Sequence, residues 1–362
     1  MKALVLADAS AWHTGRYISE LRRQCHTVWL VSMQHGMKVN YQLTPSRYGE
    51  ALSYFSHVST LKALLDELKP DVVNSHFASA YGVMAARCRR RYGDCGALWA
   101  LTVWGSDILV SPGKSYLHKR RVRYALDSAD VILADSTYLA QETAGLTDKP
   151  VEVVLWGIER RHCADDGMLK SRAQAMRSRG ANGRLKLFMP RPHRALYDND
   201  TLLSAIAPLL QSKRATVTIN STGALYQSFM RHAVALGVSD CVMAYQPCPR
   251  DEYLTLLQEH DIYLSASRSD SSPVSQIESQ AVGVFPVCAE HPGLHDLLSA
   301  SARKYSVFDR EDPAGALDVI ERLCGLNEER LFTLLRSNRD IVREKAIYEN
   351  NITETVNILE RF

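Results

Sequence analysis

Short apolar runs alternate with longer amphipathic segments along the first half of this chain, and this alternation restricts the fold more than any other feature. Buried strands that alternate with helices are typical of a parallel, doubly wound sheet with helices on both faces. The expected strands are Ala3–Ala7, Val28–Val31, Val72–Ser75, Leu98–Val103, Val131–Ala134 and Val151–Leu155. The expected helices are Trp12–Arg23, Leu61–Leu68, Tyr81–Arg91 and Ser115–Asp127.

The same alternation starts again after a polar stretch. The expected strands of the second half are Leu185–Met189, Thr216–Asn220, Cys241–Ala244, Ile262–Ser265 and Val284–Cys288. Its expected helices are Thr201–Leu210, Tyr226–Leu236, Glu252–Glu259, Pro273–Val282 and a tail, Asn327–Phe362, that breaks near Tyr348. A chain of 362 residues exceeds what a single core usually serves. We therefore predict an α/β fold of two Rossmann-like doubly wound domains that face a cleft.

The domain boundaries follow from the same pattern. We expect a first domain at residues 1–160, a linker region at 161–183 and a second domain at 184–344. The C-terminal helix, residues 345–362, is expected to pack back on the first domain. Ligands of such sheets gather at the carboxyl ends of the strands.

Composition narrows the class of protein. A hydrophobic content of 46% and a charged content of 23% are those of a soluble globular protein. No apolar run approaches the roughly 18–20 residues that span a bilayer, and the N-terminus, MKALVLADAS, reads as a first strand rather than a signal peptide. The eight cysteines are scattered without a CxxC pair, which predicts reduced thiols without a zinc site or a disulfide framework. We therefore expect a cytoplasmic protein.

Basic residues are concentrated on two of the expected helices. They are Arg87, Arg89, Arg90 and Arg91 on one helix, and Lys114, Lys119, Arg120, Arg121 and Arg123 on the other. Such side chains can simply complement a helix dipole. Alternatively, they form a surface attracted to anionic lipid or to a phosphorylated acceptor. We expect no nucleic-acid partner, because the net charge is only +3 and no aromatic and basic residues interleave.

The stretch Ser267–Val287 carries the clearest sign of chemistry. Asp270 and Glu278 stand eight positions apart, on either side of an expected helix start with Ser272 as N-cap and Pro273 in the first turn. The first N–H groups of a helix bind phosphate, and carboxylates bind sugar hydroxyls. A nucleotide-sugar fits this combination. The alternative is an ordinary capped helix with two surface acids, in which Ser275 and Glu278 form a capping box.

Several motifs in order resemble those of one family. The segment from Asp270 to Val287, which ends in SPVSQIESQAVGVFPV, carries its Glu-x7-Glu signature as Asp270-x7-Glu278. PRPHRALYDNDTLLSAI resembles its segment with a donor-phosphate arginine. KPDVVNSHFASAYG, TVWGSDIL, SADVILADS and VEVVLWGIE resemble landmarks of its first half. Over nearly its whole length, the chain resembles the group-one glycosyltransferases (family four, retaining, GT-B fold).

The resemblance implies roles for individual residues. On the donor side it implies Arg194, Asp270, Ser272, Pro273, Val274, Glu278 and Gly157. Arg194 would pair with the donor diphosphate, and the backbone of the Ser-Pro-Val turn would bind the same phosphates. Asp270 would accept hydrogen bonds from the transferred sugar and Glu278 from the ribose. Gly157 would allow a close approach of the chain to the cleft.

On the acceptor side the resemblance implies the TVWGSD loop. Trp104 would line this side, and Asp107 would lie near the reacting centre, with Asp107 or His76 as candidate base. His13 and Gly15 lie in a first strand-to-helix loop that lacks the family's usual pair of glycines, and they could contact an acceptor or a phosphate. Catalytic roles would fall to Asp107, Asp270 and Arg194.

Two further departures concern the donor side. The first carboxylate is Asp270 rather than Glu, and Asn199 stands where the family commonly has Lys. One phosphate cation is therefore missing or supplied elsewhere. The candidates to supply it are Arg191, His193 and Arg268.

Together these features lead to one functional hypothesis. It is transfer of a hexose-type sugar, with retention, from a UDP- or GDP-sugar to a saccharide or lipid-linked acceptor in surface polysaccharide, lipopolysaccharide or glycolipid assembly. We expect no required metal, because no DxD motif stands at a strand end, and the protein would visit the inner membrane face as a peripheral protein. The alternatives are a catalytically silent nucleotide-sugar-binding GT-B protein or partner subunit, and, less favoured by the motifs, an epimerase or phosphorylase.

Overall fold

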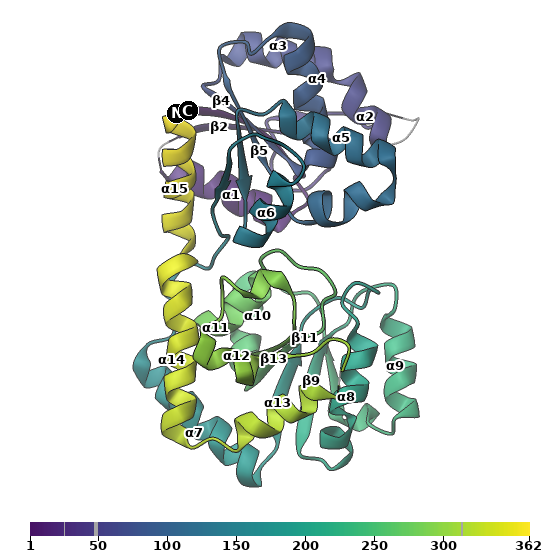
Figure 1. The fold of residues 1–362 in the computed structure, drawn as a ribbon, viewed down its shortest axis with the longest axis vertical. Coiled ribbons are helices and arrows are strands. Elements are labelled where there is room, and N and C mark those ends of the chain that lie inside the picture. The colour runs from purple at the N-terminus through teal and green to yellow at the C-terminus, as the bar shows by residue number, and fades with distance from the viewer. Residues whose placement is uncertain (25, 47–49, 313) are drawn as a thin grey trace. The chain divides into compact units, whose positions relative to one another are not determined.

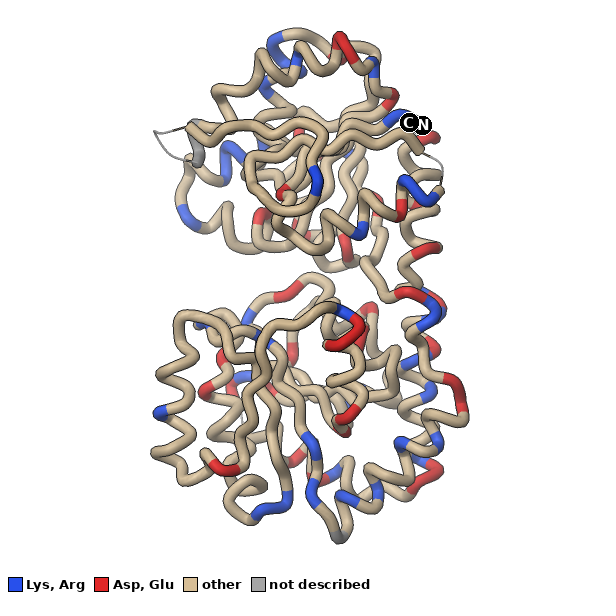
Figure 2. Tube along the Cα trace, turned by 180° about the vertical axis from the view of Figure 1, so that it is seen from behind, with Lys and Arg blue, Asp and Glu red and all other residues tan. Residues whose placement is uncertain are grey.

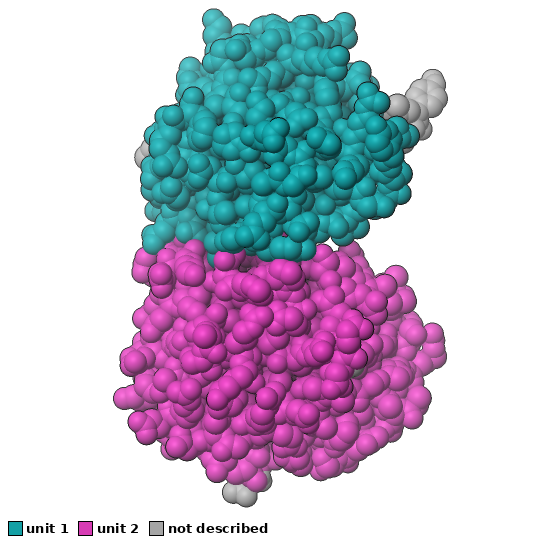
Figure 3. Space-filling model, in the orientation of Figure 1, with its two compact units in different colours: residues 1–155, 349–362 teal, residues 156–348 magenta. Residues whose placement is uncertain are grey.

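The computed structural model describes residues 1–24, 26–46, 50–312 and 314–362, which form two compact units (Figure 3). Unit 1 comprises Met1–Leu155 and Glu349–Phe362, and unit 2 comprises Trp156–Tyr348. Each unit contains one parallel sheet covered by helices (Figure 1). The predicted pair of doubly wound α/β domains is confirmed.

Unit 1 is built on a seven-stranded sheet. Its strands are β1 Lys2–Leu6, β2 Thr27–Ser32, β3 Tyr41–Gln42, β4 Val72–His76, β5 Leu98–Thr102, β6 Val131–Ala134 and β7 Val151–Val153. Their order is β3-β2-β1-β4-β5-β6-β7, and every pairing is parallel. The order reverses between β1 and β4, which places a topological switch point, the usual ligand position of such sheets, at their carboxyl ends.

The helices of unit 1 cover both faces of this sheet. They are α1 Trp12–Arg23, α2 Glu50–Ser56, α3 Val58–Leu68, α4 Gly82–Tyr92, α5 Tyr116–Asp127, α6 Thr137–Ala144 and α15 Tyr348–Arg361. Two π-helical turns, Phe77–Tyr81 and Ser106–Val110, and a 3-10 turn, Ser111–Lys114, follow β4 and β5. Helix α15 buries Ile358 and Leu359 against strand residues such as Val131 and Leu133, so the last helix of the chain completes the core of unit 1.

Unit 2 repeats the architecture with six strands. They are β8 Leu185–Met189, β9 Ala215–Asn220, β10 Val242–Tyr245, β11 Ile262–Ser265, β12 Phe285–Ala289 and β13 Val307–Phe308. The order β10-β9-β8-β11-β12-β13 is again all parallel and reverses between β8 and β11. Its helices are α7 Asp166–Asn182, α8 Asn199–Gln211, α9 Tyr226–Ala235, α10 Arg250–Gln258, α11 Val274–Ala281, α12 Ala300–Ser306, α13 Gly315–Cys324 and α14 Glu328–Lys345.

The segment expected as a linker differs from that expectation. Most of it forms α7, which Asp165 caps by accepting a hydrogen bond of 2.8 Å from the Met168 amide. Leu169, Ala173 and Met176 lie on one face of α7 and are buried in the core of unit 2. A stripe this narrow leaves most of the helix polar, which is why its composition resembled that of a connection.

The C-terminal tail breaks where the sequence predicted. Helix α14 ends at Lys345 and α15 begins at Tyr348. Between them Ile347 forms a parallel bridge with Ile158. The described cysteines are free thiols, whereas Cys25 lies outside the described residues. Among the described helices, none combines the length and apolar character that a bilayer span requires.

Candidate functional site

The donor-side residues gather at the carboxyl edge of the unit 2 sheet. Parallel strands bring their carboxyl ends to one edge, so the loops that leave those ends lie beside one another. The loop after β8 carries Arg191 and Arg194, and the loop after β11 carries Asp270 and leads into α11 with Glu278. The fold therefore places the predicted donor residues on neighbouring loops of one unit.

Asp270 is held by an arginine from the loop after β8. Its carboxylate pairs with the Arg191 guanidinium, and the two side chains are only 18% and 16% exposed. The same guanidinium lies 5.0 Å from the centre of the Tyr197 ring. A loop after β12 packs against the backbone of Asp270, because a Cβ on Gly293 would stand 2.6 Å from the Asp270 carbonyl oxygen. Only glycine allows this contact between the two loops.

Glu278 is paired in the same manner. Its side chain is 5% exposed and its Oε1 accepts a hydrogen bond from Arg250, the first residue of α10. Arg250 also lies 3.4 Å from the Glu159 carboxylate. The sequence interpretation missed Arg250. Its position at the start of a helix could have indicated the pair, because a cation there opposes the helix dipole and is stabilised by an acidic partner.

Helix α11, which begins between Asp270 and Glu278, starts one residue later than expected. Pro273, with φ −70° and ψ 98°, is the N-cap of α11, and Ser272 is buried with no partner for its Oγ among the described residues. The predicted Ser272 cap is therefore wrong, since the extended Pro273 stands outside the helix. The capping box does not form either: Ser275 Oγ lies 2.8 Å from Tyr263 Oη. The amides of Val274 and Ser275, at the start of α11, have no carbonyl acceptor within the helix.

Asn199 stabilises the loop after β8 by hydrogen bonds. Its side chain is buried, and its Nδ2 donates to the Arg191 carbonyl at 3.0 Å and to His193 Nδ1 at 3.3 Å. His193 Nε2–H in turn donates to the Asn220 carbonyl at 2.8 Å, and burial lowers the pKa of this imidazole. Asn199 is thus a brace of the loop. Arg194 projects from the loop as an exposed side chain.

The three candidates for the missing cation are now distinguishable. Arg191 lies at the site beside Asp270. His193 is a buried, neutral part of the loop. Arg268 is 60% exposed and pairs with Asp198 at 2.8 Å. Of these, Arg191 is the cation that the structure brings to the Asp270 carboxylate.

Gly157 serves a backbone contact within unit 2. A Cβ there would stand 2.2 Å from the Ala346 carbonyl oxygen and 3.0 Å from the Tyr348 nitrogen. The adjoining Ile158 amide donates to that same Ala346 carbonyl at 3.0 Å. The contact that requires a glycine here is therefore the packing of the chain between α14 and α15.

Three of the acceptor-side residues gather at the switch point of unit 1. The His13 ring centre lies 4.2 Å and the His76 ring centre 5.5 Å from that of Trp104. Burial lowers the pKa of His13 to about 4 and that of His76 to about 3. Both imidazoles are therefore neutral at pH 7. His76 is buried, whereas His13 and Trp104 are partly exposed and form the accessible part of this uncharged aromatic surface.

The other two acceptor-side residues, Asp107 and Gly15, lie in a loop contact and in a helix. Asp107 Oδ1 accepts from the Trp104 amide at 3.0 Å and Oδ2 from the Ala78 amide at 2.7 Å, which ties two loops together. Burial raises the pKa of Asp107, and the bonds from backbone amides oppose this rise. Gly15 lies within α1, where a Cβ would make an ordinary contact with Met37 Sδ at 3.5 Å. The described residues contain no group of three or more His, Cys, Asp or Glu side chains that could hold a metal ion.

Each half of the chain matches the model of a known protein family. The family described as "Glycosyl transferase 4-like" matches residues 2–136, and "Glycosyl transferases group 1" matches residues 189–331. The second match includes the loop after β8, α10 and α11. No curated protein matches the chain in sequence.

Solved structures share the whole architecture. HepE from Anabaena, in complex with UDP and glucose, is 13% identical, with a TM-score of 0.78 over 100% of both chains. Sucrose-phosphate synthase from Thermosynechococcus elongatus is 11% identical, with a TM-score of 0.81 over 100% of this chain and 98% of that one. The galactosyltransferase WaaB, described as acting on the lipopolysaccharide outer core, is 13% identical, with a TM-score of 0.68 over 98% and 99%. The likeness to these structures shows the GT-B fold. The two family matches show that this chain belongs to the group 1 glycosyltransferases.

Proposed function

We propose that this glycosyltransferase moves a hexose-type sugar from a UDP- or GDP-sugar to an acceptor hydroxyl, with retention at the anomeric carbon. The observation that carries the proposal is the donor edge of unit 2, where Asp270 and Glu278 flank the first amides of α11, which have no carbonyl partner within the helix. Arg194 projects from the neighbouring loop. Structures of HepE with UDP and with UDP-glucose have the same fold, which supports a nucleotide-sugar donor.

The leaving diphosphate needs stabilisation as its bond to the sugar breaks. Arg194 would pair with it, while the amides of Val274 and Ser275 and the positive end of α11 would face its oxygens. Such fixed donors lower the barrier because they need no reorganisation when charge develops. The proposal includes no metal ion.

The two carboxylates would orient the sugar and the ribose. Arg191 fixes the position of Asp270, which would accept hydrogen bonds from hydroxyls of the transferred sugar. Arg250 does the same for Glu278, which would accept from the ribose. A carboxylate held in this way keeps its geometry when the donor binds, and this increases the effective concentration of the reactive conformer.

The acceptor would bind in unit 1 against His13 and Trp104, and the buried His76 would support the Trp104 ring. These groups are neutral, so they suit a saccharide or lipid-linked acceptor, whose hydroxyl proton would pass to an oxygen of the leaving phosphate as the new glycosidic bond forms. Asp107 would brace this surface rather than act as base, because both of its oxygens accept amide bonds. We place the reaction in surface polysaccharide, lipopolysaccharide or glycolipid assembly, in the cytoplasm at the inner membrane face.

A donor screen followed by one substitution tests the proposal. A panel of nucleotide-sugars should contain one that raises the melting temperature, since a ligand that binds the native state stabilises it. With that donor, Arg194→Ala should lower sugar transfer about 100-fold, whereas Arg231→Ala, which removes an exposed arginine of α9, should leave it unchanged.

Two results would contradict the proposal. Equal transfer by the two arginine variants would remove Arg194 from the donor site. A donor that stabilises the protein but is neither transferred nor hydrolysed would instead identify a catalytically silent binder. NMR of the product would show whether the anomeric configuration is retained.

A further inference from the structure

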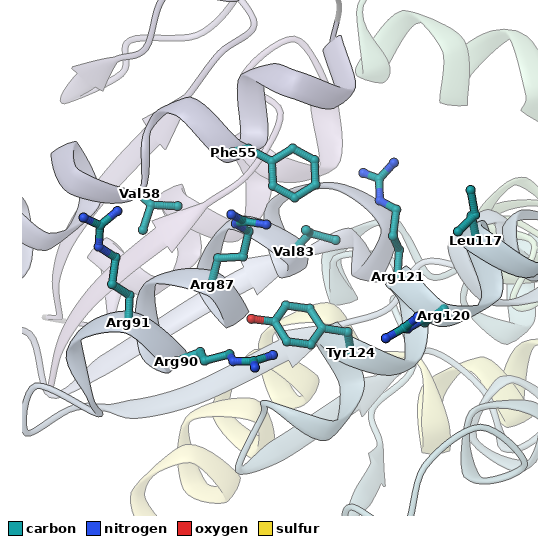
Figure 4. Close-up of a pocket in the computed structure, with 10 residues that line it drawn as sticks. All are labelled: Phe55, Val58, Val83, Arg87, Arg90, Arg91, Leu117, Arg120, Arg121 and Tyr124. Carbon is teal, nitrogen blue, oxygen red and sulfur yellow. The ribbon is translucent and has the colours of Figure 1, made fainter.

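An arginine-rich pocket lies among α2, α3, α4 and α5 of unit 1 (Figure 4). Its volume is about 730 Å³, within the range of small-molecule sites. Five arginines line it: Arg87, Arg90 and Arg91 of α4, and Arg120 and Arg121 of α5. The two basic helices noted in the sequence thus turn part of their charge toward one cavity. We call it the arginine pocket.

The arginine pocket is not neutralised by the residues that the structure describes. None of its described lining residues is acidic, and none of the five arginines forms an ion pair with a described residue. By contrast Arg89, on the same helix, points elsewhere and pairs with Asp130 at 2.7 Å. Along α14 and α15, acidic and basic positions intersperse (Figure 2). The positive charge of the pocket therefore favours the binding of an anionic ligand.

Aromatic rings position the guanidinium groups. The Arg87 guanidinium lies 4.4 Å and the Arg121 guanidinium 5.6 Å from the centre of the same Phe55 ring, and Arg90 lies 6.0 Å from that of Tyr124. Stacking on a ring holds a planar guanidinium in place with its N–H groups still able to bind. Two like charges at one ring repel each other, and a bound anion would remove this repulsion.

The arginine pocket also has an apolar part. Phe55, Val58 and Val83 contribute to its lining, and Leu117, at its rim, is 68% exposed. The adjacent Tyr116 is 77% exposed. An exposed leucine and tyrosine beside cations that no described acidic side chain pairs match a ligand that carries both negative charge and hydrocarbon.

From this combination we propose that the arginine pocket binds a lipid phosphate, meaning a phosphomonoester or diphosphate group on a hydrocarbon chain. Five cations around one cavity exceed what the single charge of a phosphodiester would balance, whereas a phosphomonoester or diphosphate carries more. The arginines would bind the phosphate oxygens, and Leu117 with the apolar lining would contact the first part of the chain.

The arginine pocket shares an element with the aromatic surface of unit 1. The Arg121 side chain donates to the Ser79 carbonyl at 3.3 Å, and Ser79 belongs to the π-helical turn Phe77–Tyr81. Phe77 of that turn stacks on Trp104 with ring centres 5.9 Å apart. A lipid phosphate in the pocket would therefore sit one short element away from the proposed acceptor surface.

A vesicle experiment with the full chain tests the inference. We compare flotation with phosphatidylcholine vesicles that contain phosphatidic acid or phosphatidylglycerol at equal surface charge. Binding should favour phosphatidic acid, and Arg87→Gln/Arg121→Gln should weaken it about 30-fold or more, because each substitution removes charge-assisted hydrogen bonds to the phosphate oxygens. The control Lys119→Gln/Arg123→Gln removes the same charge from α5 outside the pocket and should weaken binding less than threefold.

Equal losses in the two variants, or equal binding to the two lipids, would overturn the inference in favour of general surface attraction. Calorimetry separates the phosphate from the chain: farnesyl diphosphate should bind at least tenfold more tightly than inorganic pyrophosphate. Equal affinities would remove the lipid from the proposal. Neither measurement uses a sugar donor or turnover. In the calorimetry, Arg87→Gln/Arg121→Gln should weaken farnesyl diphosphate binding and Arg194→Ala should not, which separates the arginine pocket from the proposed diphosphate site of unit 2.

Discussion

At the scale of single residues, the donor edge depends on a buried carboxylate and one arginine. We predict that Arg250→Gln lowers the free energy of unfolding by about 3 kcal/mol, because it removes the guanidinium that neutralises a Glu278 side chain only 5% exposed. Arg214→Gln is the matched control, since it breaks a pair with Glu321 whose side chains are 47% and 41% exposed. That loss should stay below about 1 kcal/mol. Urea denaturation measures both.

The same pair offers a second check. Arg250→Gln/Glu278→Gln should be more stable than Arg250→Gln alone, because the double variant no longer buries an uncompensated charge at position 278, while the more exposed Glu159 carboxylate is the same in both variants. If the double variant is the less stable of the two, the ion pair is not the origin of the effect. The sequence pointed to both carboxylates but not to their pairing, since Arg250 is 28 positions and Arg191 79 positions away from the acid that each one binds. Short motifs do not report such distant partners.

At the scale of elements, contacts between loops shape the donor edge. We predict that Gly293→Ala reduces donor turnover at least tenfold, because its Cβ would stand 2.3 Å from the Ser271 carbonyl and displace the loop that carries Asp270. Gly315→Ala is the control in the same unit, where the Cβ would meet Phe308 at an ordinary 3.6 Å. Steady-state kinetics with saturating acceptor would show the difference. Equal rates would mean that the two loops move independently.

Elements were predictable where periodicity was strong and uninterrupted. The bounds of α1 and β8 agree with the sequence pattern residue for residue. The sequence pattern did not predict helices α2, α6, α12 and α13 or strands β3 and β13. Most of these are short: α2 and α12 have seven residues and β3 and β13 have two. The start of α11 was displaced by one residue, since Pro273 fits both a first helical turn and a cap, and its ψ of 98° depends on the packed loop around it.

At the scale of the whole molecule, buried histidines link folding to pH. Burial lowers the pKa of seven of them: His13, His26, His76, His162, His193, His260 and His291. The unfolded chain therefore binds more protons than the native chain below the ordinary pKa of 6.5. The contribution of these histidines to the free energy of unfolding is fully present above pH 6.5. It decreases as the pH is lowered through 6.5 and stops decreasing only below their native pKa values.

His76 gives this linkage a direct test. Its native pKa is about 3, so between pH 7.5 and 5.5 it should cost the native state about 1.4 kcal/mol as the unfolded imidazole takes up a proton. His76→Phe should lose that much less free energy of unfolding over the same interval, and its ring has no hydrogen bond to forfeit among the described residues. His35→Gln, at an exposed position, serves as the control and should follow the wild type. Parallel pH curves for His76→Phe and the wild type would show that His76 becomes protonated in the native state, and its burial at the switch point of unit 1 would then not exclude charge.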